Sequence, residues 1–189
     1  MLVLKKAEHM LRLKTPLQEE DIKKLKIGDE ILLSGVVFTA RDKAHQFLLE
    51  EDFNEMKNSV VYHCGPIIKG KEVIAAGPTT SARLNKYTPA LIKKYNIKGI
   101  IGKGGMDDSV AKAIKDKAVY FSAIGGLAVI YAKKMRIKDV YKKEFGMPEA
   151  IWKIEIEDFP VVITIDFKGN SLYKKVYQNS KKQLSKLIR

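Results

Sequence analysis

An α/β domain with a mixed β-sheet is the fold that this sequence predicts, and three observations lead to it. Short apolar runs of strand length alternate with stretches of helical periodicity along most of the chain. Such alternation is typical of βα units whose strands pair in parallel. Near the end, two apolar runs, Ile151–Glu157 and Val161–Phe167, follow one another with only a junction at Pro160 between them. This closing pair of strands indicates that the sheet is mixed.

The remaining elements follow from periodicity and from turn residues. Further strands are expected at 31–38, 60–63, 73–76, 99–102 and 119–124. Two of these runs are closed by Gly65-Pro66 and Gly77-Pro78, which favour turns. Helices are expected at 87–95, 107–115 and 126–134. Another helix should begin near Thr39-Ala-Arg-Asp42, because Thr39 can cap a helix and Asp42 suits its positive end.

The composition is that of a folded chain with one domain. The 189 residues contain 46% hydrophobic and 30% charged residues, and no Ser/Gly/Pro-rich linker divides them. We predict a single domain over residues 1–189 with a basic C-terminal extension from about residue 173. No apolar run approaches the roughly 20 residues that cross a bilayer. We therefore expect a cytoplasmic protein that neither enters a membrane nor is secreted.

The net charge of +13 is concentrated towards the C-terminus. From Tyr173 to Arg189 there are five Lys and one Arg and no acidic residue. A nucleic-acid-binding module is one interpretation of this tail, but lysines elsewhere alternate with Glu and Asp, so we do not expect nucleic acid as the main partner. A positive field would also favour an anionic substrate or an acidic partner subunit.

The single cysteine, Cys64, excludes an internal disulfide, an iron–sulfur cluster and a structural zinc site held by this chain alone. We predict no metal site here, so any metal chemistry must come from another chain. Cys64 is expected to be a small buried residue. The three histidines, His9, His45 and His63, receive no functional role from their positions.

The densest chemical signal is Gly77-Pro-Thr-Thr-Ser-Ala-Arg83, which places three hydroxyls and a guanidinium after a turn. Backbone N–H groups, the hydroxyls of Thr79, Thr80 and Ser81, and the planar fork of Arg83 together could bind a carboxylate. An ordinary Ser/Thr helix cap explains the same residues equally well. Both interpretations remain open on the sequence alone.

Two more strand ends carry cations. Gly102-Lys-Gly-Gly105 follows a short apolar strand, although it lacks the flanking pattern of a P-loop and could be a plain tight turn. Thr39-Ala-Arg-Asp42 brings Arg41 to the end of another strand. Ligands of open α/β sheets gather at the carboxyl ends of strands, so three cationic strand ends together predict an anion site.

Six segments, taken together and in order, resemble the β subunit of class I fumarate hydratases and L-tartrate dehydratases. The resemblance covers about residue 8 to about residue 173 and rests on Gly35–Asp42, His63–Pro66, Gly77–Arg83, Gly102–Gly105, Ile124–Gly126 and Gly146–Trp152. It implies a three-layer β/β/α "swivelling" domain, which forms the C-terminal domain in one-chain relatives. It also implies a partner α subunit that carries a four-iron four-sulfur cluster on three cysteines.

The resemblance further implies roles for individual residues. Arg41 and Arg83 would grip the substrate carboxylate remote from iron, Lys103 would add a carboxylate contact, and Thr79 would be the catalytic hydroxyl in proton transfer. Thr79 would need an acidic neighbour from across the subunit interface, because a threonine hydroxyl is too weak an acid to serve unaided. Supporting residues would be Gly77, Thr80, Ser81 and Gly104.

The activity implied is that of a hydro-lyase that hydrates fumarate to L-malate and is active only with its α subunit. L-tartrate and a methyl-substituted fumarate remain open as substrates, because the clamp residues contact carboxylates that all three share. The stoichiometry of the complex is also open. A basic nucleic-acid-binding module is the alternative from a different class of function.

Overall fold

The computed structural model describes residues 10–188, so His9 and the first residues of the predicted domain lie outside the described part. Its strands are β1 (Leu11–Lys14), β2 (Glu30–Thr39), β3 (Val60–Tyr62), β4 (Ile67–Lys69), β5 (Glu72–Ala75), β6 (Gly99–Gly102), β7 (Val119–Ser122), β8 (Met135–Tyr141) and β9 (Ile151–Ile165). Its α-helices are α1 (Glu19–Ile22), α2 (Asp42–Glu50), α3 (Thr88–Tyr95), α4 (Asp108–Ile114), α5 (Ala128–Ala132) and α6 (Leu172–Leu187). Three 3-10 helices are η2 (Asn54–Met56), η3 (Ser81–Leu84) and η4 (Lys143–Phe145).

The main sheet is mixed, as predicted. Its seven strands run in the order β1-β2-β3-β6-β7-β9-β8, and β4 and β5 form a separate hairpin. Strands β1, β2, β3, β6 and β7 are parallel to one another, whereas β9 is antiparallel to β2, β7 and β8. Because β9 pairs with both β2 and β7, the sheet folds back on itself. Because β2, β3 and β6 are parallel neighbours, their carboxyl ends meet at one edge of the sheet.

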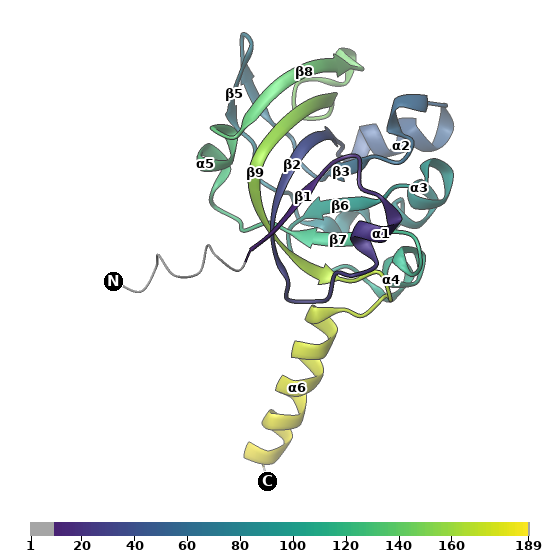
Figure 1. Cartoon of the computed structure of the whole chain (residues 1–189), viewed down its shortest axis with the longest axis vertical. Coiled ribbons are helices and arrows are strands. Elements are labelled where there is room, and N and C mark those ends of the chain that lie inside the picture. Colours follow the sequence, from purple (N-terminus) through teal and green to yellow (C-terminus); the bar gives the residue numbers. More distant parts are fainter. Residues whose placement is uncertain (1–9, 189) are drawn as a thin grey trace.

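Two separate cores confirm the β/β/α layering. Alternate residues of the parallel strands point to opposite faces, so Tyr62 joins the core between the two parts of the sheet, whereas Val61 joins the core beneath the helices. The first core is lined by β2, β3, β6, β7 and β9, and the second by the same parallel strands with α2, α3 and α4. Figure 1 shows these three helices together on one side of β3, β6 and β7. Burying each large apolar side chain contributes roughly 1.5–3 kcal/mol.

The closing pair of strands is a single strand, which corrects the expectation of two. Strand β9 runs without interruption from Ile151 to Ile165, and Pro160 pairs opposite Leu32 of β2. A register shift between Leu33 and Gly35 lies close to this point, and Asp158 has a positive φ of 45°. Such a bulge accommodates the missing N–H of a proline inside a long strand.

The helix after β2 begins at Asp42 without a threonine cap, contrary to expectation. Thr39 belongs to β2, and its buried Oγ accepts a hydrogen bond from Trp152 N at 3.0 Å. Arg41 holds the N-cap position of α2, with no side-chain cap hydrogen bond among the described residues. Thr39 therefore ties β2 to β9 instead of starting the helix.

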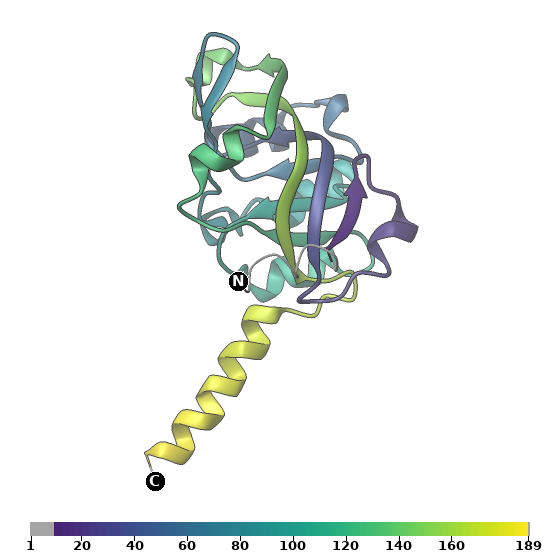
Figure 2. The ribbon, with the colours of Figure 1, turned by 60° about the vertical axis from the view of Figure 1, so that its left-hand side comes forward.

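The basic extension forms α6, which leaves the body of the molecule as a rod (Figures 1 and 2). None of its residues, Leu172 to Leu187, all within the described part, is buried. Among residues 10–188, no helix has the length and apolar character that crossing a bilayer requires.

Candidate functional site

The candidate site lies at the edge where the parallel strands end. Arg41 follows β2, His63 follows β3, and Lys103 follows β6. The pairing of β2 with β3 and of β3 with β6 brings these three positions to the same edge. The prediction that cationic strand ends gather there holds for Arg41 and Lys103, and the loop carrying Arg83 joins them.

The segment Pro78–Ser81 is inserted between the ends of β3 and β6. Thr79 N donates to His63 O at 2.7 Å, and Lys103 N donates to Thr79 O at 3.2 Å. Ser81 N then donates to Lys103 O at 3.0 Å. These backbone hydrogen bonds join the loop to both strand ends, as those of a short additional strand would. Thr79 is therefore held at the centre of the strand ends.

Thr79 and Arg83 are in direct contact. An Nη2 hydrogen of Arg83 is donated to Thr79 Oγ1. The two residues are four positions apart in the chain. The 3-10 helix η3, which begins at Ser81, turns the Arg83 side chain back towards Thr79. Thr80 is the N-cap residue of η3, but its exposed side chain makes no cap hydrogen bond within the described chain. Helix capping therefore does not account for this run of hydroxyls.

Ser81 fixes the loop from beneath. Its buried Oγ lies 2.8 Å from His63 Nδ1. A Cβ at position 102 would lie 1.8 Å from this oxygen, so only glycine is tolerated at Gly102. Gly77 lies close to α5, where an added Cβ would meet Ala128 Cβ at 3.0 Å, a tight contact but not a clash like that at Gly102. The glycines of the two motifs thus allow the loop and the strands to approach closely.

A pair of buried histidines connects this loop to Arg41. The His45 and His63 rings lie 5.2 Å apart between centroids, and His45 Nδ1 lies 2.8 Å from Arg41 O. Because a carbonyl only accepts, His45 Nδ1 carries the proton. Burial lowers the pKa of His45 to about 4, and burial followed by the neighbouring His45 lowers the pKa of His63 well below its usual value. Within the described residues, the Nε2 atoms of both rings have no hydrogen-bond partner.

The Arg41 side chain is held by two further contacts. Its Nε lies 3.4 Å from Glu149 Oε1, and Glu149 Oε2 accepts from Lys43 N at 3.0 Å. An added Cβ at Gly65 would lie 2.7 Å from Arg41 Cδ, so the guanidinium stem passes close over that glycine. Arg41 is therefore oriented by the loop after β3 and by the segment before β9.

Lys103 and the glycines around it form the third side of the site. A Cβ at Gly125 would lie 3.0 Å from Lys103 Cδ, which places the lysine stem along the loop after β7. Gly104 has a positive φ of 76°, and its carbonyl accepts from Tyr120 Oη at 2.9 Å. This tyrosine is largely buried, and burial raises the pKa of its hydroxyl. The backbone on either side of Lys103 is therefore anchored.

Cys64 lies under the loop, where it cannot serve as a thiolate. It is fully buried, pairs with Pro78 through a β-bridge, and burial raises the pKa of its thiol to about 12. Among residues 10–188, no group of three or more His, Cys, Asp or Glu is arranged to hold a metal ion. This donor set does not fit an iron–sulfur cluster on this chain.

Sequence reasoning missed three residues that support the site: His45, His63 and Glu149. The histidines were left without a role because a lone histidine in a helix or at a strand end carries no signal by itself. Glu149 belongs to a segment that carried the family resemblance, but its pairing with Arg41 spans more than a hundred positions. Only the fold reveals such contacts.

The comparisons with known proteins point to one family. The family model described as "Fumarase C-terminus" matches residues 3–176 and so ends within α6. A protein of Geobacillus stearothermophilus named as a class I fumarate hydratase is 39% identical over 184 residues, which cover 93% of this chain but 36% of that protein. The chain thus corresponds to about a third of that relative's length.

Two relatives named as β subunits match over most of their length. One of Methanocaldococcus jannaschii, named as an L(+)-tartrate dehydratase subunit beta, is 40% identical over 189 residues, with 91% of this chain and 95% of the relative covered. The L(+)-tartrate dehydratase subunit beta of Escherichia coli K12 is 33% identical over 170 residues, covering 85% of each chain.

Proposed function

Because the chain belongs to the Fumarase C-terminus family, we propose that it is the β subunit of a two-subunit hydro-lyase that reversibly hydrates fumarate to L-malate. It is active only with an α subunit, in a cytoplasmic complex. The second candidate is the β subunit of an L-tartrate dehydratase, which the names of two relatives favour. A methylfumarate hydratase would use the same residues.

The contact between Arg83 and Thr79 is the observation that carries this proposal. A guanidinium has five N–H donors, so Arg83 can hold the threonine oxygen and still present a donor pair to a carboxylate. A donor at the threonine oxygen also favours loss of its proton, because it stabilises the anion. One arginine thus aligns the substrate with the hydroxyl that exchanges its proton.

Arg41 and Lys103 complete the clamp in this proposal. Glu149 Oε1 lies 3.4 Å from Arg41 Nε as an ion-pair partner and helps to orient the guanidinium, whose terminal nitrogens would bind the substrate. Lys103 adds a point charge from the next strand end, and its backbone is tied to Thr79. A dicarboxylate held by fixed cations loses little further freedom when it reacts. The three cations also favour binding of a doubly charged anion over its neutral analogues.

Thr79 requires a base that this chain does not present beside it within the described residues. The contacts of its side chain and backbone are with Arg83, His63 and Lys103, none of which is a carboxylate. The α subunit is therefore proposed to supply the acidic group across the interface. The four-iron four-sulfur cluster is proposed to lie on the same subunit, because the only cysteine here is a buried, protonated thiol.

The test is an anaerobic assay of the chain alone and after co-expression with the cluster-bearing subunit from the same genome. Fumarate hydration, L-tartrate dehydration and methylfumarate hydration are measured in parallel. Activity only in the mixture is expected, and the preferred substrate decides between the two candidates. Activity of the isolated chain, or none with a cluster-loaded partner, would overturn the proposal.

A further inference from the structure

Helix α6 presents an apolar stripe that nothing in the described chain covers. Exposed residues at helical spacing line one face: Val176, Tyr177, Leu184 and Leu187, with Ile188 just after the helix. Tyr177 is 68% exposed and Leu187 is 83% exposed. Apolar groups at such spacing on a soluble helix indicate a binding face. Most of this helix also lies beyond the residues that the family model matches.

The other face of α6 is strongly basic. Lys175, Lys182 and Lys186 lie opposite the stripe, Lys174 and Lys181 flank it, and no acidic residue occurs in Leu172–Leu187. Two such helices packed stripe to stripe would bring Lys174 and Lys181 of one copy near those of the other, with no acidic residue of α6 to offset them, which disfavours a second copy of this chain as the occupant. A surface with an apolar groove and acidic rims would receive α6 better.

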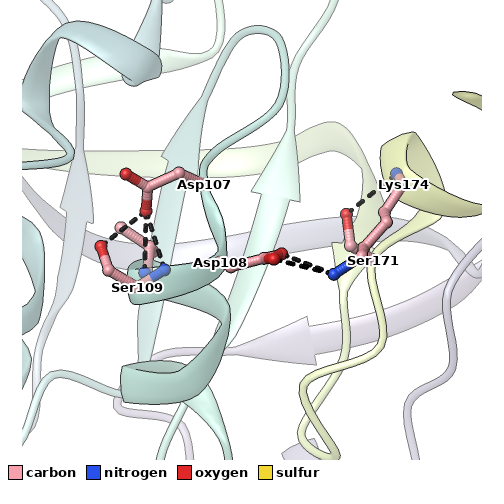
Figure 3. A network of polar contacts seen from close by, with 6 residues as sticks. Asp107, Asp108, Ser109, Ser171 and Lys174 are labelled. Atoms are coloured by element: carbon pink, nitrogen blue, oxygen red, sulfur yellow. Dashed lines mark hydrogen bonds and ion pairs between the residues drawn. The ribbon is translucent and has the colours of Figure 1, made fainter.

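The first turn of α6, here called its root, packs against the edge of the candidate site. An added Cβ at Gly105 would lie 3.1 Å from the Tyr173 ring, so the first turn packs on the loop that carries Lys103. Lys174 Nζ bonds both oxygens of Asp108 at 2.9 and 2.8 Å, and Ser171 Oγ accepts from Lys174 N at 3.3 Å (Figure 3).

The same figure shows how the start of α4 is fixed beside this root. Asp107 Oδ1 caps α4 by accepting from Ser109 N at 3.0 Å and from Val110 N at 3.1 Å. Helix α6 therefore begins beside the fixed N-terminus of α4, close to the strand ends that the proposed partner subunit would cover.

We propose that α6 is an arm that docks on the cluster-bearing α subunit, with its apolar stripe in a groove and the lysines that flank the stripe against acidic residues. This inference rests on the proposed function, because it names the partner that completes the same site. A rod of 16 residues extends about 24 Å at 1.5 Å per residue, enough to reach well past the site edge. Its departure from the body (Figures 1 and 2) suits a reach across a neighbouring subunit better than flat binding to a lipid surface.

The experiment measures the Kd between the full-length chain and the purified cluster-bearing subunit from the same genome, under anaerobic conditions. The variant Leu184→Gln/Leu187→Gln removes two residues of the stripe. The matched control, Asn179→Gln/Ser185→Gln, introduces the same residue on the opposite side of the helix. Glutamine supports helices well, so circular dichroism should be equal for all three proteins.

The stripe variant is expected to weaken assembly by about 30-fold, as for loss of two buried interface side chains. The control should stay within about twofold, as is usual for exposed substitutions. Raising the salt concentration should weaken assembly of the wild type, and it should weaken assembly of Lys181→Gln less, because Lys181 flanks the stripe.

Equal affinities of the stripe variant and the wild type would overturn the inference while leaving the proposed function intact. Stripe-dependent binding to phosphatidylglycerol vesicles or to RNA, with unchanged subunit affinity, would overturn it as well. Absence of any complex between the wild type and the cluster-bearing subunit would instead overturn the proposed function, and the docking inference with it.

Discussion

The loop at the strand ends and helix α6 are held in opposite ways. The loop Pro78–Ser81 is fixed by backbone hydrogen bonds to the ends of β3 and β6 and by a buried contact between Ser81 and His63. Helix α6 has no buried residue in Leu172–Leu187, and an exposed ion pair and one tyrosine ring fix its first turn. An isolated helix of this length is marginal in water.

The difference teaches how each part of the proposed function can be tested. The proposed clamp is held in place by contacts within this chain, so its residues can be tested by their effect on chemistry. The proposed arm would be covered by a partner, so its residues can be tested by their effect on assembly. Changes in the loop should therefore alter turnover without altering assembly, and changes in α6 should do the reverse.

Thr79→Val is expected to have the largest effect. Valine keeps the shape of the side chain but cannot transfer a proton, so kcat of the assembled enzyme should fall by about a thousandfold, within the range of general acid–base catalysis. Deuterium exchange at the substrate carbon, followed by NMR, gives the readout. Assembly should be intact. Unchanged exchange would remove Thr79 from the mechanism, and Thr80→Val is the neighbouring control, with a much smaller loss expected.

Arg83→Lys should come next. Lysine keeps the charge but loses the planar fork that can hold Thr79 and a carboxylate together, so kcat/KM should fall about a hundredfold, or about 3 kcal/mol. Steady-state kinetics of the complex with the preferred dicarboxylate measure this. Arg136→Lys, an exposed arginine of β8, serves as the control. Near-normal turnover of the Arg83 variant would contradict the clamp.

The sequence alone predicted the parts of the site that depend on local patterns. Apolar runs ending in Gly-Pro pairs located the strands, and the cations after those runs located Arg41 and Lys103. Strand β8 was missed because its sequence, MRIKDVY, carries three charges that interrupt its apolar residues. The continuity of β9 was missed because Pro160 usually ends a strand, and only the bulge near Asp158 explains how this one continues.

The supports of the clamp were not predictable, because they join residues far apart in the chain. His63 and Ser81 are 18 positions apart, and Thr39 and Trp152 are 113 apart. No periodicity links such positions. The basic composition of the tail was evident, but whether it formed a free helix or packed on the body depended on surfaces that only the folded chain presents.

The histidine pair predicts a loss of stability in mild acid. Burial lowers the pKa of His45 to about 4, whereas His45 in the unfolded chain titrates near its ordinary value. Between these values the unfolded state binds more protons, so the free energy of unfolding falls as pH falls. His45 alone should remove about 2 kcal/mol between pH 7 and pH 5. The charged and aromatic residues near the His45 ring are Arg41, Asp42, His63 and Tyr87.

Guanidinium denaturation at the two pH values tests this prediction. His45→Gln retains a donor for the Arg41 carbonyl but cannot titrate, so its stability should change less between pH 7 and pH 5 than that of the wild type. Parallel pH dependences for the two proteins would show that His45 is not buried as a neutral ring. The contrast between a loop with buried supports and an exposed helix α6 would then be weaker.

The smallest effect is expected at the root of α6. Asp108→Asn removes the ion pair with Lys174, whose side chains are 69% and 54% exposed. Exposed pairs contribute between about 0 and 1 kcal/mol, and salt screens them. The free energy of unfolding should therefore change by less than about 1 kcal/mol, and the change should shrink further at high salt. Glu144→Gln, in another exposed pair, is the control. A loss above about 2 kcal/mol would exceed any exposed pair, so α6 would be part of the folded body and not an arm awaiting a partner.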